Sequence, residues 1–108
     1  MGATPEGNTK KRIKKVLEEA GAYFFMPVQA GFGVTSLDFL CARPSDGRAF
    51  AIEAKAHGKR PTERQEVVID RMIKRGWRVF IIDDEYPGLI LNYESCEDLR
   101  AWLKGNAP

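Results

Sequence analysis

The stretch FAIEAK at residues 50–55, with LDFLC at residues 37–41, decides the fold and the chemistry expected of this chain. Each stretch is short, apolar and typical of a β-strand, yet each contains an acid. A carboxylate within a buried strand is costly unless a cation or hydrogen bonds take up its charge. Because side chains alternate along a strand, Glu53 and Lys55 point to the same sheet face. Two acids and a lysine converging on one face suit a divalent metal beside a scissile phosphate, so we predict a chemical site here.

The elements around these two strands follow from hydrophobic periodicity and from the signals at element ends. A first helix is predicted to begin with Thr4 as N-cap and Pro5 as first helical residue, and to stop at Gly21. The later predicted elements are strands at 23–28, 37–42 and 48–55, a helix that starts with the capping box 62–65 and ends at Gly76, a strand at 78–83, an edge strand within 86–93, and a last helix capped by Ser95.

This order of elements predicts an α/β fold in which helices flank a mixed central sheet. A turn at residues 44–47 joins the second and third strands as a hairpin, whereas the third and fourth strands are parallel and connected through a helix. We expect one domain over residues 1–108, because 108 residues supply one core and no linker divides the chain.

Composition is that of an ordinary globular protein, with 44% hydrophobic and 30% charged residues. The sequence contains no signal peptide and no apolar run near the roughly 20 residues that span a bilayer, so we expect a cytoplasmic protein. Cys41 and Cys96 are too few for a disulfide framework or a zinc site, and both are interpreted as reduced thiols.

The net charge is only +2, but the basic residues are unevenly distributed. Some cluster in the first helix and others follow the FAIEAK strand, as expected for a phosphodiester substrate such as DNA. The alternative for each run is an ordinary solvated helix face. The candidate DNA contacts are Lys10, Lys14, His57, Lys59, Arg60 and Arg64.

Phosphodiester hydrolysis needs a metal that neutralises phosphate charge, an activated water and a cation for the transition state. Mg²⁺ keeps several waters, so Asp38, Glu53 and the main-chain carbonyl of Ala54 would suffice as protein ligands. Lys55 would orient or deprotonate the attacking water, or stabilise charge on the phosphate. The alternative is a Glu53–Lys55 ion pair on a solvated sheet face, worth less than about 1 kcal/mol.

Four further residues are considered for roles in the site. Gln65 shares a helical stripe with apolar residues and so faces the strand ends, or it serves only in the capping box. His57 is more typical of a phosphate contact or surface residue than of a general base. Ser36 and Cys41 lack the histidine partner of a nucleophilic hydrolase, which argues against acyl transfer.

With Glu6, then GFGVTSLDFL, then FAIEAKAHGKRPTERQ, the chain resembles the PD-(D/E)XK nuclease superfamily and, more narrowly, a stand-alone VRR-NUC domain of the kind often encoded by phages. The resemblance runs from Glu6 to about residue 84. It implies a restriction-endonuclease-like core, with Asp38 and Glu53 as metal ligands and Lys55 as the catalytic lysine. It also implies that Glu6 completes the site, in one reading through a metal-bound water, and that Gln65 begins the helix beside it. Leu37 departs from the proline of the superfamily name, a change that touches no ligand.

The resemblance further implies Mg²⁺- or Mn²⁺-dependent cleavage of DNA, with homodimers acting on four-way junctions in compact members. Small size points the same way, because symmetric nicking of a junction calls for two active sites about a two-fold axis. A dimer interface is expected near residues 27–32, where Phe32 lies between glycines, or on the Trp102 helix, although either segment could instead be core or turn. The alternative functions are restriction-like cleavage of plain duplex and a non-catalytic DNA-binding module. If the chain is encoded by a phage, the expected location is the cytoplasm of the host.

Overall fold

The computed structural model describes residues 4–28, 36–56, 58–83, 93–105 and 107–108. In this part of the chain the elements are α1 (Pro5–Ala20), β1 (Tyr23–Phe25), β2 (Phe39–Ala42), β3 (Ala49–Ala54), α2 (Glu63–Lys74), β4 (Arg78–Ile82) and α3 (Cys96–Lys104). The strands form one sheet in the order β1-β2-β3-β4. Neighbours are antiparallel except for β3 and β4, which are parallel, so the predicted mixed sheet is confirmed.

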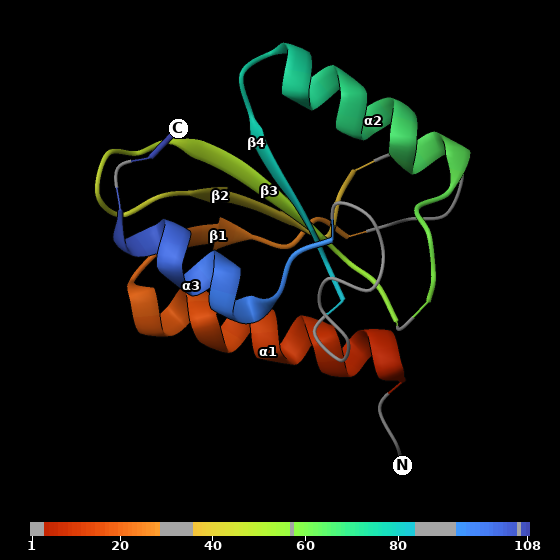
Figure 1. Cartoon of the computed structure of the whole chain (residues 1–108), viewed down its shortest axis with the longest axis horizontal. Coiled ribbons are helices and arrows are strands. Elements are labelled where there is room, and N and C mark those ends of the chain that lie inside the picture. The colour runs from red at the N-terminus through yellow and green to blue at the C-terminus, as the bar shows by residue number, and fades with distance from the viewer. Residues whose placement is uncertain (1–3, 29–35, 57, 84–92, 106) are drawn as a thin grey trace.

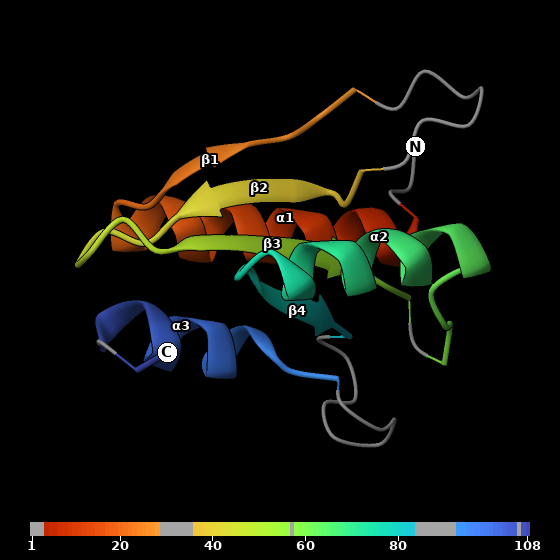
Figure 2. The ribbon, with the colours of Figure 1, turned by 90° about the horizontal axis from the view of Figure 1, so that it is seen from above.

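The two faces of the sheet are covered differently. Figures 1 and 2 show α1 and α3 side by side under one face, with α2 over part of the other. The core lies between the sheet and the α1–α3 layer, and it includes Ile13, Leu17, Phe50, Phe80 and Leu99, all with no exposed surface. Because alternate residues of β3 point to opposite faces, Phe50, Ile52 and Ala54 enter this core while Glu53 points to the α2 side.

The helix ends are those that the sequence predicts. Thr4 accepts a hydrogen bond from the amide of Gly7 and Pro5 is the first residue of α1, which ends at Gly21 in the left-handed conformation (φ 72°). Thr62 and Ser95 each form a capping box, with Gln65 and Asp98 respectively. No helix within the described residues is both long enough and apolar enough to cross a membrane.

The strands are shorter than predicted, and two of the differences concern the site. Asp38 lies just before β2 and Lys55 just after β3, where the sequence prediction had placed both inside strands. Strand pairing ends there because the Asp38 side chain, in place of a β2 main-chain oxygen, accepts the hydrogen bond of the Ala54 amide. β1 stops at Phe25, two residues before a proline that has no amide hydrogen to donate to a ladder.

The apolar stripe of α2 is only partly covered. None of its residues is buried, and Val67 and Ile73 are 51% and 56% exposed. The helix covers only the β4 side of its sheet face, which is too little surface to enclose its apolar stripe. Part of the α2 side of the sheet is therefore left uncovered, and Tyr23 and Phe25 of β1 are largely exposed.

Trp102 of α3 packs against the core. Its ring makes edge-on contacts with Phe50 and Phe80 at centroid distances of 5.0 and 5.2 Å. The buried guanidinium of Arg43 stacks on the other side, 4.1 Å from the ring centroid. Of the two predicted interface segments, the Trp102 helix is thus part of the core. Residues 29–32 of the other segment, including Phe32, and the predicted edge strand as far as residue 92 lie outside the described residues. Cys41 and Cys96 are both buried, and neither forms a disulfide within the part of the chain that the structure describes.

Candidate active site

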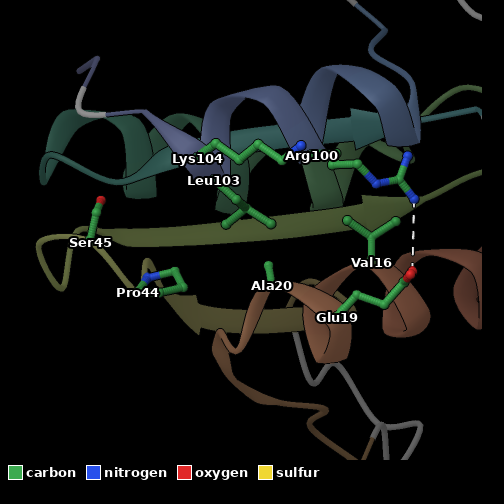
Figure 3. Close-up of a pocket in the computed structure, with 8 residues that line it drawn as sticks. All are labelled: Val16, Glu19, Ala20, Pro44, Ser45, Arg100, Leu103 and Lys104. Carbon is green, nitrogen blue, oxygen red and sulfur yellow. Dashed lines mark ion pairs between the residues drawn. The ribbon is translucent and has the colours of Figure 1, made fainter.

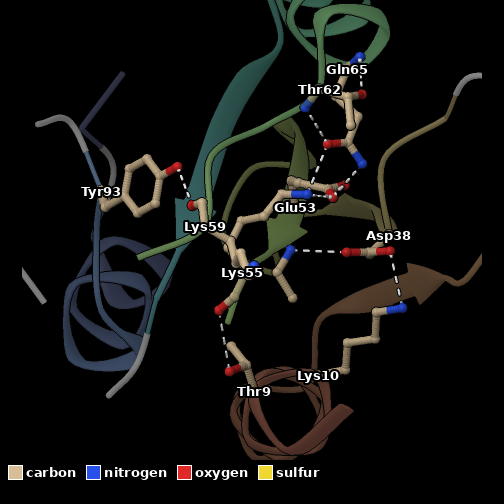
Figure 4. Close-up of polar contacts among 10 residues, drawn as sticks. Thr9, Lys10, Asp38, Glu53, Lys55, Lys59, Thr62, Gln65 and Tyr93 are labelled. Carbon is tan, nitrogen blue, oxygen red and sulfur yellow. Dashed lines mark hydrogen bonds and ion pairs between the residues drawn. The ribbon is translucent and has the colours of Figure 1, made fainter. Parts of the chain in front are cut away.

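Asp38 and Glu53 meet at one end of the sheet, where β2 begins and β3 ends. The Asp38 oxygen Oδ2 accepts a 2.9 Å hydrogen bond from the amide of Ala54, the residue that follows Glu53. This bond fixes the Asp38 carboxylate beside the end of β3, although Asp38 stands outside the strand. Figure 4 shows the two acids with Lys55 and Gln65 between the start of α2 and the first half of α1.

Glu53 is almost fully buried, with 2% of its surface exposed. Its oxygen Oε2 accepts a 2.8 Å hydrogen bond from Gln65 Nε2 and lies 3.1 Å from the ammonium nitrogen of Lys55. Its other oxygen, Oε1, is buried and has no hydrogen-bond partner among the described residues. Burying a carboxylate oxygen without a partner is costly. Oε1 is therefore an oxygen that is available to bind a cation.

Lys55 is also buried, and its ammonium group donates to Gln65 Oε1 at 2.8 Å as well as pairing with Glu53. The predicted Glu53–Lys55 pair therefore exists, but it is enclosed by protein and not on a solvated sheet face. A buried ion pair adds little to the stability of the fold, because the desolvation of both charges offsets much of their attraction. Stability alone therefore does not explain why the pair is present.

Gln65 both completes the capping box of α2 and contacts the site, so the two interpretations of this residue hold together. Its Oε1 accepts from the Thr62 amide at 2.9 Å in the capping box of α2, and the same amide group contacts both Lys55 and Glu53. The first turn of α2 is thereby attached to Glu53 of β3 and to Lys55 just after that strand. A single side chain thus holds the helix start and the site in one geometry.

The surroundings of Glu53 make its ionised form unfavourable unless a cation is near. Burial, followed by the negative charge of Asp38, raises the pKa of Glu53 to about 7, an effect that the charge and hydrogen bond of Lys55 oppose and that Glu6 adds to. Glu6, Asp38 and Glu53 exceed Lys10 and Lys55 by one charge, and a divalent ion would relieve this excess.

The first half of α1 closes the site from the other side. Thr9 is buried and its hydroxyl lies 3.5 Å from the carbonyl oxygen of Lys55. Lys10, predicted as a DNA contact, places its ammonium nitrogen 3.2 Å from Asp38 Oδ1. Glu6 is half-buried, one turn before Lys10, and its charge acts on Glu53. Lys14 is exposed on the same helix.

The loop after Lys55 carries the basic residues Lys59 and Arg60, both exposed, and is held at two points. The amide of Gly58 donates to the buried Asp83 at 3.3 Å, and the hydroxyl of Tyr93 donates to the carbonyl of Lys59 at 2.7 Å. Arg64 is exposed on the first turn of α2. His57 lies outside the described residues.

The donor set fits a hard divalent ion more than a soft one. Among the described residues there is no cluster of three or more histidine, cysteine or acid side chains able to hold a metal. Mg²⁺ does not need one, since two carboxylates and a main-chain carbonyl leave room for waters and substrate oxygens. The orphaned Oε1 of Glu53 is the observation that supports such a fit.

A cavity of about 560 Å³ lies at the opposite end of the sheet, between the end of α1, the β2–β3 turn and α3 (Figure 3). Its walls include Val16, Leu103 and Arg100, the last paired with Glu19 at 3.9 Å. No residue of the candidate site lines it, so it is separate from the chemistry described above.

The fold is an α/β core in which helices flank a mixed central sheet, as predicted. A solved structure described as "VRR_NUC domain" has the same fold, with a TM-score of 0.68 and 23% sequence identity over 97% of this chain and 100% of that one. The chain therefore has the fold of a VRR_NUC domain. No protein-family model matches the sequence, and neither does any curated protein.

Sequence reasoning missed the residues that hold the site in place. The side chains of Thr9, Asp83 and Tyr93 form hydrogen bonds with main-chain atoms in and beside the site, and such contacts leave no pattern in the sequence. The role of Lys10 had one available signal: it follows Glu6 by four residues, so both lie on one face of α1.

Proposed function

We propose that this chain is a divalent-metal-dependent endonuclease that hydrolyses phosphodiester bonds in DNA, using Mg²⁺ or Mn²⁺. The fold of a VRR_NUC domain structure is consistent with this activity. The observation that carries the proposal is the buried, unpartnered Oε1 of Glu53, next to Asp38 and a buried lysine. A site built only for stability would leave no such oxygen, because an apolar residue there costs less.

Each residue of the site has a part in the proposal. Asp38 and Glu53 would hold the ion, with the Ala54 carbonyl as a third ligand and Glu6 nearby, directly or through water. When bound, the ion would polarise the scissile phosphate and lower the pKa of a coordinated water. Lys55 would orient that water or stabilise the developing charge on phosphate, and Gln65 would keep the lysine and Glu53 aligned.

The DNA-facing surface in this proposal is the side of the site that carries Lys59, Arg60 and Arg64, and His57 is a further candidate contact from the same stretch of sequence. Their charges would neutralise backbone phosphates and so position the duplex without reading its sequence. The anchoring of the loop by Asp83 and Tyr93 supports this role, because a fixed loop loses less entropy when it binds.

We further propose that the enzyme acts as a homodimer on branched DNA, with four-way junctions preferred to plain duplex. A two-fold dimer would place two sites on opposite strands of a junction. The exposed apolar residues in and just after β1, among them Phe25 at 54% and Val28 at 87%, are the described surface best suited to meet a second copy.

The test is a cleavage assay with junction, flap and linear duplex DNA of equal length, in Mn²⁺, in Mg²⁺ and in a chelator. We expect cleavage in the metals and none in the chelator, and its loss in Asp38→Asn, Glu53→Gln and Lys55→Met. Asp70→Asn is the matched control, because Asp70 is an exposed acid on α2 that pairs only with Lys74 in the described contacts.

Each outcome distinguishes the candidate functions. Equal cutting of junction and linear duplex would favour the restriction-like alternative, and DNA binding with no cutting in any metal would favour the non-catalytic module. Cleavage at the parent rate by any of the three site variants would remove that residue from the mechanism. Light scattering of the same samples tests the dimer, which Phe25→Glu is expected to dissociate.

A further inference from the structure

Lys10 occupies the oxygen of Asp38 that a metal would use. One carboxylate oxygen, Oδ2, is taken by the Ala54 amide at 2.9 Å, and the other, Oδ1, lies 3.2 Å from the Lys10 ammonium nitrogen. On Glu53 the oxygen Oε2 is likewise used, by Gln65 and Lys55, while Oε1 is open. The two oxygens left for an ion are therefore Glu53 Oε1, which has no described partner, and Asp38 Oδ1, which is under Lys10.

The Lys10–Asp38 contact differs from the surface ion pairs of the same molecule. The Lys10 and Asp38 side chains are 36% and 12% exposed, whereas Lys74 and Asp70 on α2 are 70% and 62% exposed. The helix that carries Lys10 is also fixed at this point, because the neighbouring Thr9 is buried against the Lys55 carbonyl. Lys10 therefore extends to the acid from a fixed part of α1, and its pair with Asp38 is less screened by solvent than the Lys74–Asp70 pair.

We propose that Lys10 is a positioning residue that couples metal binding to DNA binding, an inference that rests on the proposed function. Without DNA, its ammonium group competes with the metal for Asp38 Oδ1 and lowers the affinity for the ion. A backbone phosphate of bound DNA offers Lys10 another anion close to the same acids. Lys10 then moves to the phosphate and leaves Oδ1 to the ion.

This exchange is balanced in charge. The metal-free site holds the acids Glu6, Asp38 and Glu53 against the cations Lys10 and Lys55. A divalent ion would add two positive charges and the phosphate would bring one negative charge and a new partner for the displaced lysine. Because the coupling is between two binding equilibria, DNA must raise metal affinity by the same factor by which metal raises DNA affinity.

The test is calorimetric titration of Mn²⁺ into the full chain without DNA, for the parent, Lys10→Met and the control Lys14→Met. The control removes the same charge from the same helix, one turn further on, at an exposed position. We expect Lys10→Met to bind Mn²⁺ about three- to tenfold more tightly than Lys14→Met, as the loss of a half-buried competing ion pair implies. Lys10→Arg, which keeps the cation, should remain near the parent affinity.

A second titration measures the coupling itself. In a Lys55→Met background, in which cleavage is suppressed, a short duplex should raise Mn²⁺ affinity about three- to tenfold when Lys10 is present. After Lys10→Met the increase should fall below about twofold, since no lysine remains to transfer. Thermal unfolding of the metal-free variants confirms that each is folded before titration.

The outcomes separate this inference from the function on which it rests. If Mn²⁺ binds the parent but Lys10→Met has the affinity of Lys14→Met, Lys10 does not compete and the inference is wrong while the metal site stands. If the parent takes up no Mn²⁺ at all, both the metal site and the inference are wrong. Tighter binding by Lys10→Met, with loss of the DNA effect, establishes the coupling.

Discussion

Replacing Glu53 with glutamine should stabilise the metal-free protein at alkaline pH. Glu53 is buried beside Asp38, and its pKa is raised to about 7 from the ordinary value of 4.5. The folded state therefore holds the proton more tightly than the unfolded chain, so this residue costs stability as the pH rises from about 4.5 to about 7. Above that range the cost is constant, and below it the cost vanishes.

The magnitude follows from the two pKa values. A rise of the Glu53 pKa from 4.5 to about 7 corresponds to about 3 kcal/mol when the acid is fully ionised. The linkage relation gives a cost below about 1 kcal/mol near pH 5 and of about 3 kcal/mol near pH 8. Glutamine removes the charge and keeps the shape, so its stabilising effect should grow by about 2 kcal/mol between these two conditions.

The assay is urea unfolding of the parent and Glu53→Gln in a chelator, near pH 5 and near pH 8. Taking the difference between the two proteins at each pH cancels the titration of the groups that do not interact with Glu53. Asp70→Asn serves as the control, since that acid is exposed on α2 and lies outside the site. Added Mn²⁺ near pH 8 should stabilise the parent and leave the glutamine variant unchanged.

Two results would refute this reasoning. A Glu53→Gln protein that is less stable than the parent near pH 8 would mean that the bond to Lys55 outweighs burial. A difference between the two proteins that is the same at both pH values would mean that Glu53 titrates normally in the fold.

Three other predictions concern the groups around the acids. Tyr93→Phe removes the hydroxyl that holds the Lys59 carbonyl, so DNA affinity should fall about two- to fivefold with no change in Mn²⁺ affinity; an unchanged DNA affinity would show that the contact is dispensable. Lys59→Ala and Arg60→Ala should each reduce the magnitude of the slope of log DNA affinity against log salt concentration by about one. Lys104→Ala, which lines the cavity at the other end of the sheet, should leave this slope unchanged. Equal slopes for all three variants would contradict the proposed DNA surface. Gln65→Ala should destabilise the fold by about 1 kcal/mol through the lost capping box and also reduce cleavage at least tenfold; loss of stability with full activity would restrict Gln65 to capping.

The parts of the fold that the sequence predicted are those fixed by local rules. Thr4, Pro5 and Gly21 set the ends of α1 through caps that depend only on neighbouring residues. The alternation in FAIEAK correctly places Glu53 on the opposite face from the core residues of β3. Acids within short apolar runs were a sufficient signal to bring Asp38, Glu53 and Lys55 together.

The features that sequence reasoning missed depend on surroundings that no local pattern encodes. The apolar stripe of α2 predicts burial, yet how much of the stripe is buried depends on how far the sheet extends beneath it, and Ile73 stays largely exposed. Arg43 reads as a turn residue but is buried between Trp102 and Asp46. The contact of Lys10 with Asp38 depends on where α1 crosses the sheet end.

The most direct test of the proposed metal site is anomalous diffraction from crystals grown with Mn²⁺. The account predicts one strong peak that lies roughly 2.0–2.2 Å from both Asp38 Oδ1 and Glu53 Oε1, with the Lys10 ammonium withdrawn from Asp38. A structure in which Mn²⁺ binds elsewhere, while Lys10 remains on Asp38 and Glu53 Oε1 stays without a ligand, would contradict it.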